Sequence, residues 1–160
     1  MKPLTPAYTL FAVLALAPAP YAAAATPPTL VVAGWNTAQL ATASYAILEP
    51  QVEGNSNLVS AEQRSSILAA MKRDSAGAIV RRYPSAKIVE VATPGAINVT
   101  PTFVAPNSLV PWAKLGGRLA FQLPEGQQMV VQETFGLGTL FQHGGEFVNF
   151  MYDTLAKRLP

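Results

Sequence analysis

The sequence of 160 residues contains no cysteine, and this absence excludes several kinds of chemistry. Without a thiol, the chain forms no disulfide, offers no cysteine nucleophile or lipid-attachment site, and builds no thiolate metal centre. Charged residues make up only 12% of the chain, and His143 is its one histidine. A lone histidine leaves only carboxylates as further zinc ligands, so we expect no metal and no other cofactor.

Charge of either sign is also scarce and nearly balanced, with 11 Lys and Arg against 9 Asp and Glu. A small excess on so few charges raises the isoelectric point without creating a strong positive field. The basic residues between Ser60 and Tyr83 are scattered around a predicted helix and do not alternate with aromatic side chains. The composition therefore does not indicate a nucleic-acid partner.

The first 25 residues have the pattern of a signal peptide. Met1 and Lys2 form a short basic start, Ala7–Ala17 is an uncharged apolar run of 11 residues, and Ala22–Ala25 supplies small residues for cleavage after Ala25 or one residue earlier. A helix of that length rises about 16 Å, roughly half of a bilayer core. We therefore expect export to the periplasm or the cell exterior, with no transmembrane segment in the mature chain.

Residues 26–160 are predicted to form a single α+β domain with two amphipathic helices. Ser60–Tyr83 begins with a Ser-x-x-Gln capping box, in which Ser60 and Gln63 satisfy backbone groups at the helix start. Glu146–Leu159 is the second helix. Each helix has an apolar stripe expected to face the core, comprising Ile67, Leu68, Met71, Ala78 and Ile79 in the first and Phe147, Val148, Met151, Leu155 and Leu159 in the second.

Five segments have the apolar or alternating pattern of strands: Leu30–Ala33, Ala86–Ala92, Ala96–Val104, Gly117–Leu123 and Met129–Phe135. The first two flank the long helix, so we expect them to pair in parallel through a crossover connection. The last two enclose a Pro-Glu-Gly turn and are expected to form an antiparallel hairpin. The predicted fold has two layers: a mixed four- or five-stranded sheet and two helices on one face.

Three other segments have less regular patterns. Trp35–Leu48 is consistent with a helix capped by Asn36 or Thr37, or with a strand over Tyr45–Leu48. Glu49–Asn57 is predicted to be a loop, and Gly136–Gly145 a glycine-rich connection.

Pro101 stands inside a predicted strand. A proline cannot donate a ladder hydrogen bond, so this strand is expected at a sheet edge or a bulge. A protein partner can add a strand to such an edge.

The candidate catalytic residues are few. His143 is a candidate general base or ligand, with a structural hydrogen bond as the alternative role. Glu49 and Glu53 are the best-paired carboxylates for acid and base steps, with a solvated loop as the alternative. Trp35 and Trp112 are candidate binding residues, because an exposed loop tryptophan can anchor a partner. The alternative is a partly buried place in the core, which is the more common one for tryptophan.

Three passages resemble a group of bacterial cell-envelope domains of unknown function and the amino-terminal domain of the Tol-system periplasmic protein TolB. They are SAEQRSSILAAMKRDSAGAIVRRYP leading into AKIVEVA, the strand AINVTPTFV, and GGRLAFQLPEGQQMVVQETFG followed by a helix ending LAKRLP. Many proteins of that group carry a lipid-attachment cysteine, which this chain lacks. The resemblance implies a non-catalytic envelope component that works by contact.

The sequence therefore leads to one main hypothesis and two others. The first is an exported envelope protein that serves as a binding or assembly component and contacts a protein partner. The second is a small exported hydrolase that uses His143 or the pair Glu49 and Glu53. The third is a module that binds a small ligand between the helices and the sheet.

Overall fold

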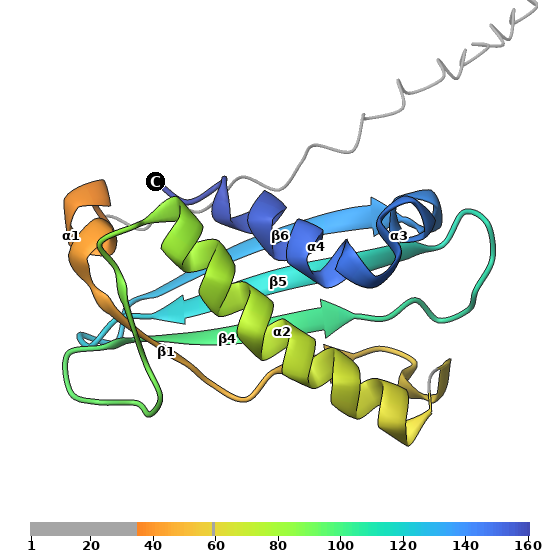
Figure 1. The fold of residues 1–160 in the computed structure, drawn as a ribbon, viewed down its shortest axis with the longest axis horizontal. Helices are drawn as coiled ribbons and strands as arrows, with labels where there is room; N and C mark the ends of the chain where they lie inside the picture. The colour runs from red at the N-terminus through yellow and green to blue at the C-terminus, as the bar shows by residue number, and fades with distance from the viewer. Residues whose placement is uncertain (1–34, 59) are drawn as a thin grey trace, which may run out of the picture.

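The computed structural model describes residues 35–58 and 60–160, and helices cover one face of a sheet (Figure 1). The predicted signal peptide and the predicted strand Leu30–Ala33 lie outside these residues. The sheet has six strands in the order β3-β1-β4-β5-β6, and β2 also pairs with β4. The elements are α1 Thr37–Thr42, β1 Ser44–Ile47, β2 Gln51–Glu53, α2 Ala61–Arg82, β3 Lys87–Val89, β4 Ile97–Val104, β5 Lys114–Gln122, β6 Gln128–Gly136, α3 Leu137–His143 and α4 Phe147–Ala156, with 3-10 turns at Ser56–Leu58 and Gly144–Glu146.

The predicted α+β class is confirmed, with α2 and α4 as the two main helices on one face of a mixed sheet. Four of the six strands, β3 to β6, match predicted strands, and β1 corresponds to the strand alternative at Tyr45–Leu48. The sixth, β2, lies within Glu49–Asn57, which we predicted to be a loop. Only three residues long, β2 pairs in parallel with the end of β4, through Gln51 with Thr102 and Glu53 with Val104. A strand this short is defined by its partner, so its polar sequence gave no local sign of it.

Both alternatives for Trp35–Leu48 occur in succession. Asn36 caps α1, accepting a hydrogen bond from the Gln39 backbone N–H at 2.8 Å, and β1 follows after Ala43. β1 pairs in parallel with β3 on one side and with β4 on the other. Within the described residues, the strand that pairs with β3 across the long helix is β1, whereas the prediction gave this role to Leu30–Ala33.

The long helix matches its prediction closely. Ser60 is the cap residue of α2, and both hydrogen bonds of the capping box with Gln63 are present. The helix ends at Arg82, two residues before Pro84. Of the predicted core stripe, Met71, Ala78 and Ile79 are buried, whereas Ile67 and Leu68 are only partly buried.

The prediction that Pro101 marks an edge or a bulge is wrong about the edge, because β4 lies between β1 and β5. The Val99 carbonyl accepts a hydrogen bond from Leu48, just after β1, so the backbone of alternate residues, including Pro101, faces the β1 and β2 side. On that side, β1 pairs as far as Val99 and β2 begins at Thr102. Pro101 occupies the gap between them, where no N–H is needed.

The predicted hairpin is confirmed, although β5 begins earlier than expected, at Lys114. Its glycines permit close packing, because a Cβ on Gly117 would lie 2.6 Å from the Cγ and Sδ atoms of Met151 on α4. The predicted glycine-rich connection Gly136–Gly145 is wrong, since Leu137–His143 forms α3. Packing of α3 against β6 and α4 offsets the weak helix propensity of this segment.

Within the described residues, β6 and the short β3 are the outer strands of the sheet. The outer edge of β6 is contacted by polar side chains. Arg158 donates a hydrogen bond to the Gln132 carbonyl at 3.4 Å and forms an ion pair with Glu133, whose carboxylate accepts from the Thr134 N–H at 3.2 Å. Charged groups at an edge strand disfavour pairing with a further strand.

Candidate functional site: an apolar pocket between two helices

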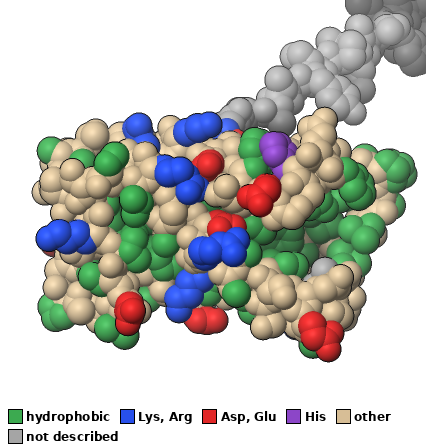
Figure 2. Space-filling model, in the orientation of Figure 1, with side chains coloured by type: hydrophobic (Ala, Val, Ile, Leu, Met, Phe, Trp, Pro, Cys, Tyr) green, Lys and Arg blue, Asp and Glu red, His purple; other side chains and the backbone are tan. Residues whose placement is uncertain are grey.

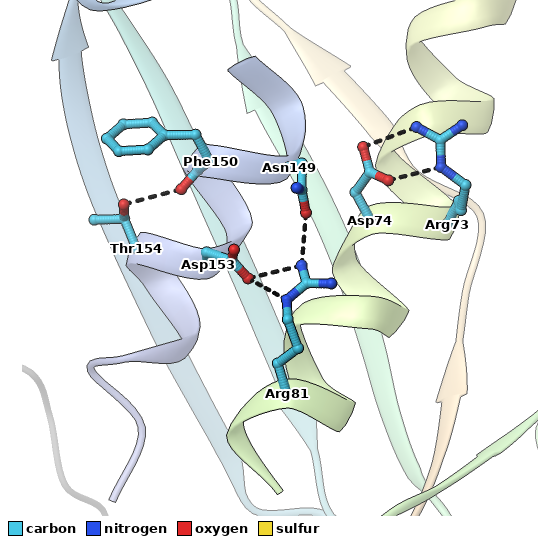
Figure 3. Close-up of polar contacts among 7 residues, drawn as sticks. All are labelled: Arg73, Asp74, Arg81, Asn149, Phe150, Asp153 and Thr154. Carbon is cyan, nitrogen blue, oxygen red and sulfur yellow. Dashed lines mark hydrogen bonds and ion pairs between the residues drawn. The ribbon is translucent and has the colours of Figure 1, made fainter. Parts of the chain in front are cut away.

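The helices α2 and α4 lie side by side and are joined near their C-terminal ends (Figures 1 and 3). The Arg81 guanidinium donates to Asp153 at 2.8 Å and to Asn149 at 2.6 Å, as Figure 3 shows. Further along, Arg82 donates to the Leu159 carbonyl at 2.8 Å and Tyr83 to the Pro160 carbonyl at 2.6 Å. These contacts hold one end of the helix pair together.

At the other end, the two helices diverge over a pocket with a cavity volume of about 550 Å³. Figure 2 shows the hollow, with hydrophobic side chains across it. The volume lies within the range of roughly 300–1,000 Å³ typical of small-molecule sites. Its main apolar lining comes from the sheet, the helices and the loop after β4, and consists of Val52, Ile67, Ala70, Phe103, Pro106, Leu109, Leu115, Leu140, Phe147 and Val148.

The pocket explains why part of each predicted core stripe is not buried. Ile67 on α2 and Val148 on α4 were both expected in the core, yet each is only partly buried and lines the pocket. The apolar faces of the two helices thus continue beyond the point where the helices cover one another. The sequence contained this signal, but the divergence that turns two core positions into a pocket wall is a tertiary property.

Large apolar side chains are exposed on two segments beside the pocket. Leu109, in the loop between β4 and β5, lines the pocket and is 63% exposed. Trp112, in the same loop, is 78% exposed, and Phe141, on α3, is 79% exposed. Figure 1 places this loop and α3 at the same end of the molecule. We call Leu109, Trp112 and Phe141 the rim residues.

The other predicted tryptophan lies in a different environment. Trp35 is only 6% exposed and packs edge-to-face on Phe121, with ring centroids 6.2 Å apart. It also lines a second cavity of about 320 Å³ with Glu125 and Gln127, and its buried indole N–H has no hydrogen-bond partner. The structure therefore separates the two predicted binding tryptophans, and of the two only Trp112 belongs to a loop that lines the large pocket, through Leu109.

His143 is the last residue of α3, one step before the 3-10 turn that leads into α4. Its ring stacks on Phe150, with centroids 3.8 Å apart and an interplanar angle of 14°. The contact joins α3 to α4 beside Gly144 and Gly145, whose backbone lines the pocket. The geometry thus gives His143 a packing role at the pocket wall.

Glu49 and Glu53 face different cations. Glu49 approaches Lys72 on α2 at 3.9 Å, whereas Glu53 forms an ion pair with Arg118 on β5. Because Gly117 faces α4, strand alternation places Arg118 on the opposite face of the sheet. The structure therefore does not unite the two carboxylates, as a glycoside-hydrolase pair would require. Across the described ranges, no three histidine or acidic side chains gather as a metal site would need.

Two tyrosine hydroxyls in the core, those of Tyr152 and Tyr45, have a raised pKa. Burial, together with the negative charge of Asp74, raises the pKa of Tyr152 well above its ordinary value. The Tyr152 hydroxyl is buried without a hydrogen-bond partner. Burial also raises the pKa of Tyr45, whose hydroxyl donates to the Leu40 carbonyl at 2.7 Å. Asp74 itself is bound by Arg73 through two hydrogen bonds of 2.7 and 3.1 Å (Figure 3).

No protein-family model matches this chain, and no curated protein matches its sequence. Similar solved structures include an uncharacterised protein, with 10% identity, a TM-score of 0.42, and coverage of 72% of this chain and 93% of that one. The PelC dodecamer from Paraburkholderia phytofirmans has 8% identity, a TM-score of 0.42, and coverage of 74% and 86%. The hypothetical protein CT253 from Chlamydia trachomatis has 9% identity, a TM-score of 0.39, and coverage of 74% and 91%. Likenesses this distant carry no functional information.

Proposed function

We propose that this protein is an exported, non-catalytic binding protein of the bacterial envelope that holds an apolar ligand between α2 and α4. The observation that carries the proposal is the pocket of about 550 Å³ with its apolar lining. Removing a ligand's apolar surface from water favours binding by roughly 25 cal/mol for each Å² buried. A pocket already open in the protein spares the ligand the cost of creating it.

Two further features support the envelope part of the proposal. Met1–Ala25 has the order of a signal peptide, with a basic start, an apolar middle and small residues at the end. The resemblance of the chain's layout to bacterial envelope domains agrees with export to the envelope.

No helix within the described residues has the length and apolar character needed to cross a membrane. A protein partner would contact the pocket end, where the rim residues present apolar surface.

Ligand binding is tested by filling the pocket. Ala70 lines the pocket from α2, and replacing it with tryptophan places a large side chain in the space where a ligand would lie. We expect wild-type protein to bind the neutral fluorescent probe N-phenyl-1-naphthylamine, and Ala70→Trp to bind it at least tenfold more weakly. The measurement is a fluorescence titration, with circular dichroism to verify that the variant is folded.

The matched control is Ser65→Trp, which places the same side chain at an exposed position of the same helix, away from the pocket. This variant should bind the probe as wild type does. If Ala70→Trp and Ser65→Trp bind equally well, the probe sits elsewhere and the pocket is not the binding site. Absence of probe binding by wild-type protein would reject the binding function itself.

Export is tested by the intact mass of the protein recovered from the periplasmic fraction or the medium of producing bacteria. We expect a chain that begins at Thr26, or at Ala25 if cleavage falls one residue earlier. Signal peptidase removes the leader during export, so the mass reports cleavage of the leader and the fraction reports the location of the protein. A protein that retains Met1–Ala25 and is recovered from the cytoplasm would contradict this part of the proposal.

A further inference from the structure

We infer that the ligand is a single-chain anionic amphiphile, such as a long-chain fatty acid, with its head group at Arg64 and its hydrocarbon chain in the apolar pocket between α2 and α4. This inference rests on the proposed binding function and specifies the ligand of the same pocket. It is carried by the charge and the arrangement of the lining residues.

The pocket has one charged position. Of the described residues that line it, Arg64 alone is charged, while Asn55 and Ser66 add polar groups and the rest of the lining is largely apolar. An apolar cavity with a single cation complements a ligand that has a long apolar part and one negative charge. Carboxylates and phosphates are the anions that a planar guanidinium binds best, often through two parallel hydrogen bonds.

The cation and the apolar wall are aligned along α2. Arg64, Ile67 and Ala70 all line the pocket and follow one another at intervals of three residues, which places them in a row on one helix face. The row extends about 9 Å, since the helix rises 1.5 Å per residue. Arg64 stands near the N-terminal end of α2, where the helices diverge, and Ala70 lies nearer the end joined by Arg81.

This direction orients the ligand. The head group lies where the two helices are farthest apart, and the chain extends past Ile67 and Ala70 toward the end of the pocket where α2 and α4 converge. Arg64 also makes a contact within the protein. A guanidinium carries five N–H donors, so it can bind a ligand's anionic group in addition to a protein group.

The first experiment compares ligands on wild-type protein by displacement of N-phenyl-1-naphthylamine. Affinity for saturated fatty acids should rise roughly fourfold with each added methylene until the chain fills the pocket. A fatty acid should bind at least tenfold more tightly than its methyl ester, which has the same chain and no charge. Equal binding of acid and ester would overturn the anionic head group while leaving the binding function intact.

The second experiment assigns the head group to Arg64. In Arg64→Gln, binding of the acid should fall at least tenfold and binding of the ester should stay the same. The control is Arg73→Gln, on the same helix but bound to Asp74 outside the pocket, which should change neither. If Arg64→Gln weakened binding of the acid and the ester alike, with an unchanged melting temperature, Arg64 would not bind the anionic group, and the assignment would be overturned.

A third arm identifies the source of the anionic group. Lysophosphatidylglycerol shares the single chain and the negative charge with a fatty acid but carries a phosphate head. Preference for the fatty acid identifies a free carboxylate as the ligand, and preference for the lysolipid identifies a phospholipid product. If neither displaces a probe that the wild-type protein does bind, the inference is wrong although the pocket still binds apolar molecules.

Discussion

Replacing Gly54 with alanine is expected to lower the free energy of unfolding by about 3 kcal/mol, a large fraction of the stability of a small domain. Gly54 follows β2 with φ at +84°, a conformation that side chains disfavour. A Cβ atom there would also lie 2.2 Å from the carbonyl oxygen of Ala105. That neighbour is backbone held by a hydrogen bond of 2.8 Å from the Ala105 N–H to the Glu53 carbonyl, so it cannot easily move.

Gly95 provides a matched control, because its φ is also +84° but no atom lies within 4 Å of the added Cβ. Gly95→Ala should therefore cost only the conformational part, about 1–2 kcal/mol. Urea unfolding of both variants measures the difference. Since Asn55 and Ala105 line the pocket, Gly54→Ala should also weaken probe binding. Equal losses of stability in the two variants would show that contact with Ala105 carries no cost.

The second large effect is expected at alkaline pH. Burial raises the pKa of Tyr45 and Tyr152 in the folded protein, whereas both ionise near pH 10 in the unfolded chain. Above pH 10 the unfolded state therefore binds fewer protons than the folded state, and stability falls as pH rises. Each tyrosine contributes a slope of about 1.4 kcal/mol per pH unit, so two units above pH 10 cost roughly 5 kcal/mol.

The measurement is urea unfolding at several pH values from 8 to 12. Tyr152→Phe removes one of the tyrosines whose pKa burial raises, so its slope above pH 10 should be smaller than that of wild type by about 1.4 kcal/mol per pH unit. At pH 8 the variant should be at least as stable as wild type, because the hydroxyl it lacks is buried without a partner. An unchanged alkaline slope in Tyr152→Phe would mean that this tyrosine does not couple ionisation to unfolding.

The parts of the fold that sequence predicted best are those with local determinants. The capping box of Ser60 and Gln63 and the apolar stripe after it define the start of α2 in adjacent residues. The hairpin of β5 and β6 follows from alternation on both sides of a short turn. In each case the interactions that fix the element lie within a few residues of one another.

The missed features depend on distant partners. β2 forms because the backbone groups of β4 beyond Val99 are not paired by β1 and can pair with it. α3 forms because β6 and α4 give it a surface for packing. Pro101 indicates that one backbone hydrogen bond is missing from the strand. Whether the strand meets this by lying at an edge or by facing a gap between two partners depends on where β1 ends and β2 begins.

The pocket was hidden for the same reason. Its wall draws on strands, helices and loops that lie far apart in the sequence, from Val52 to Val148. The sequence identified Trp112 and the apolar positions Ile67 and Val148 but could not show that the helices above them diverge. Arg64 gave no signal beyond being one of several basic residues in a helix, because its place at the pocket depends on that divergence.

The contacts at the outer edge of β6 bear on the order in which the fold is completed. Arg158 reaches the Gln132 carbonyl and Glu133 from beyond α4, 26 residues later in the chain than Gln132. A folding intermediate in which the sheet has formed but α4 has not docked therefore leaves this edge without Arg158. Because charged groups at an edge strand disfavour pairing with a further strand, docking of α4 closes the stage at which the sheet is most open to strand addition by another molecule.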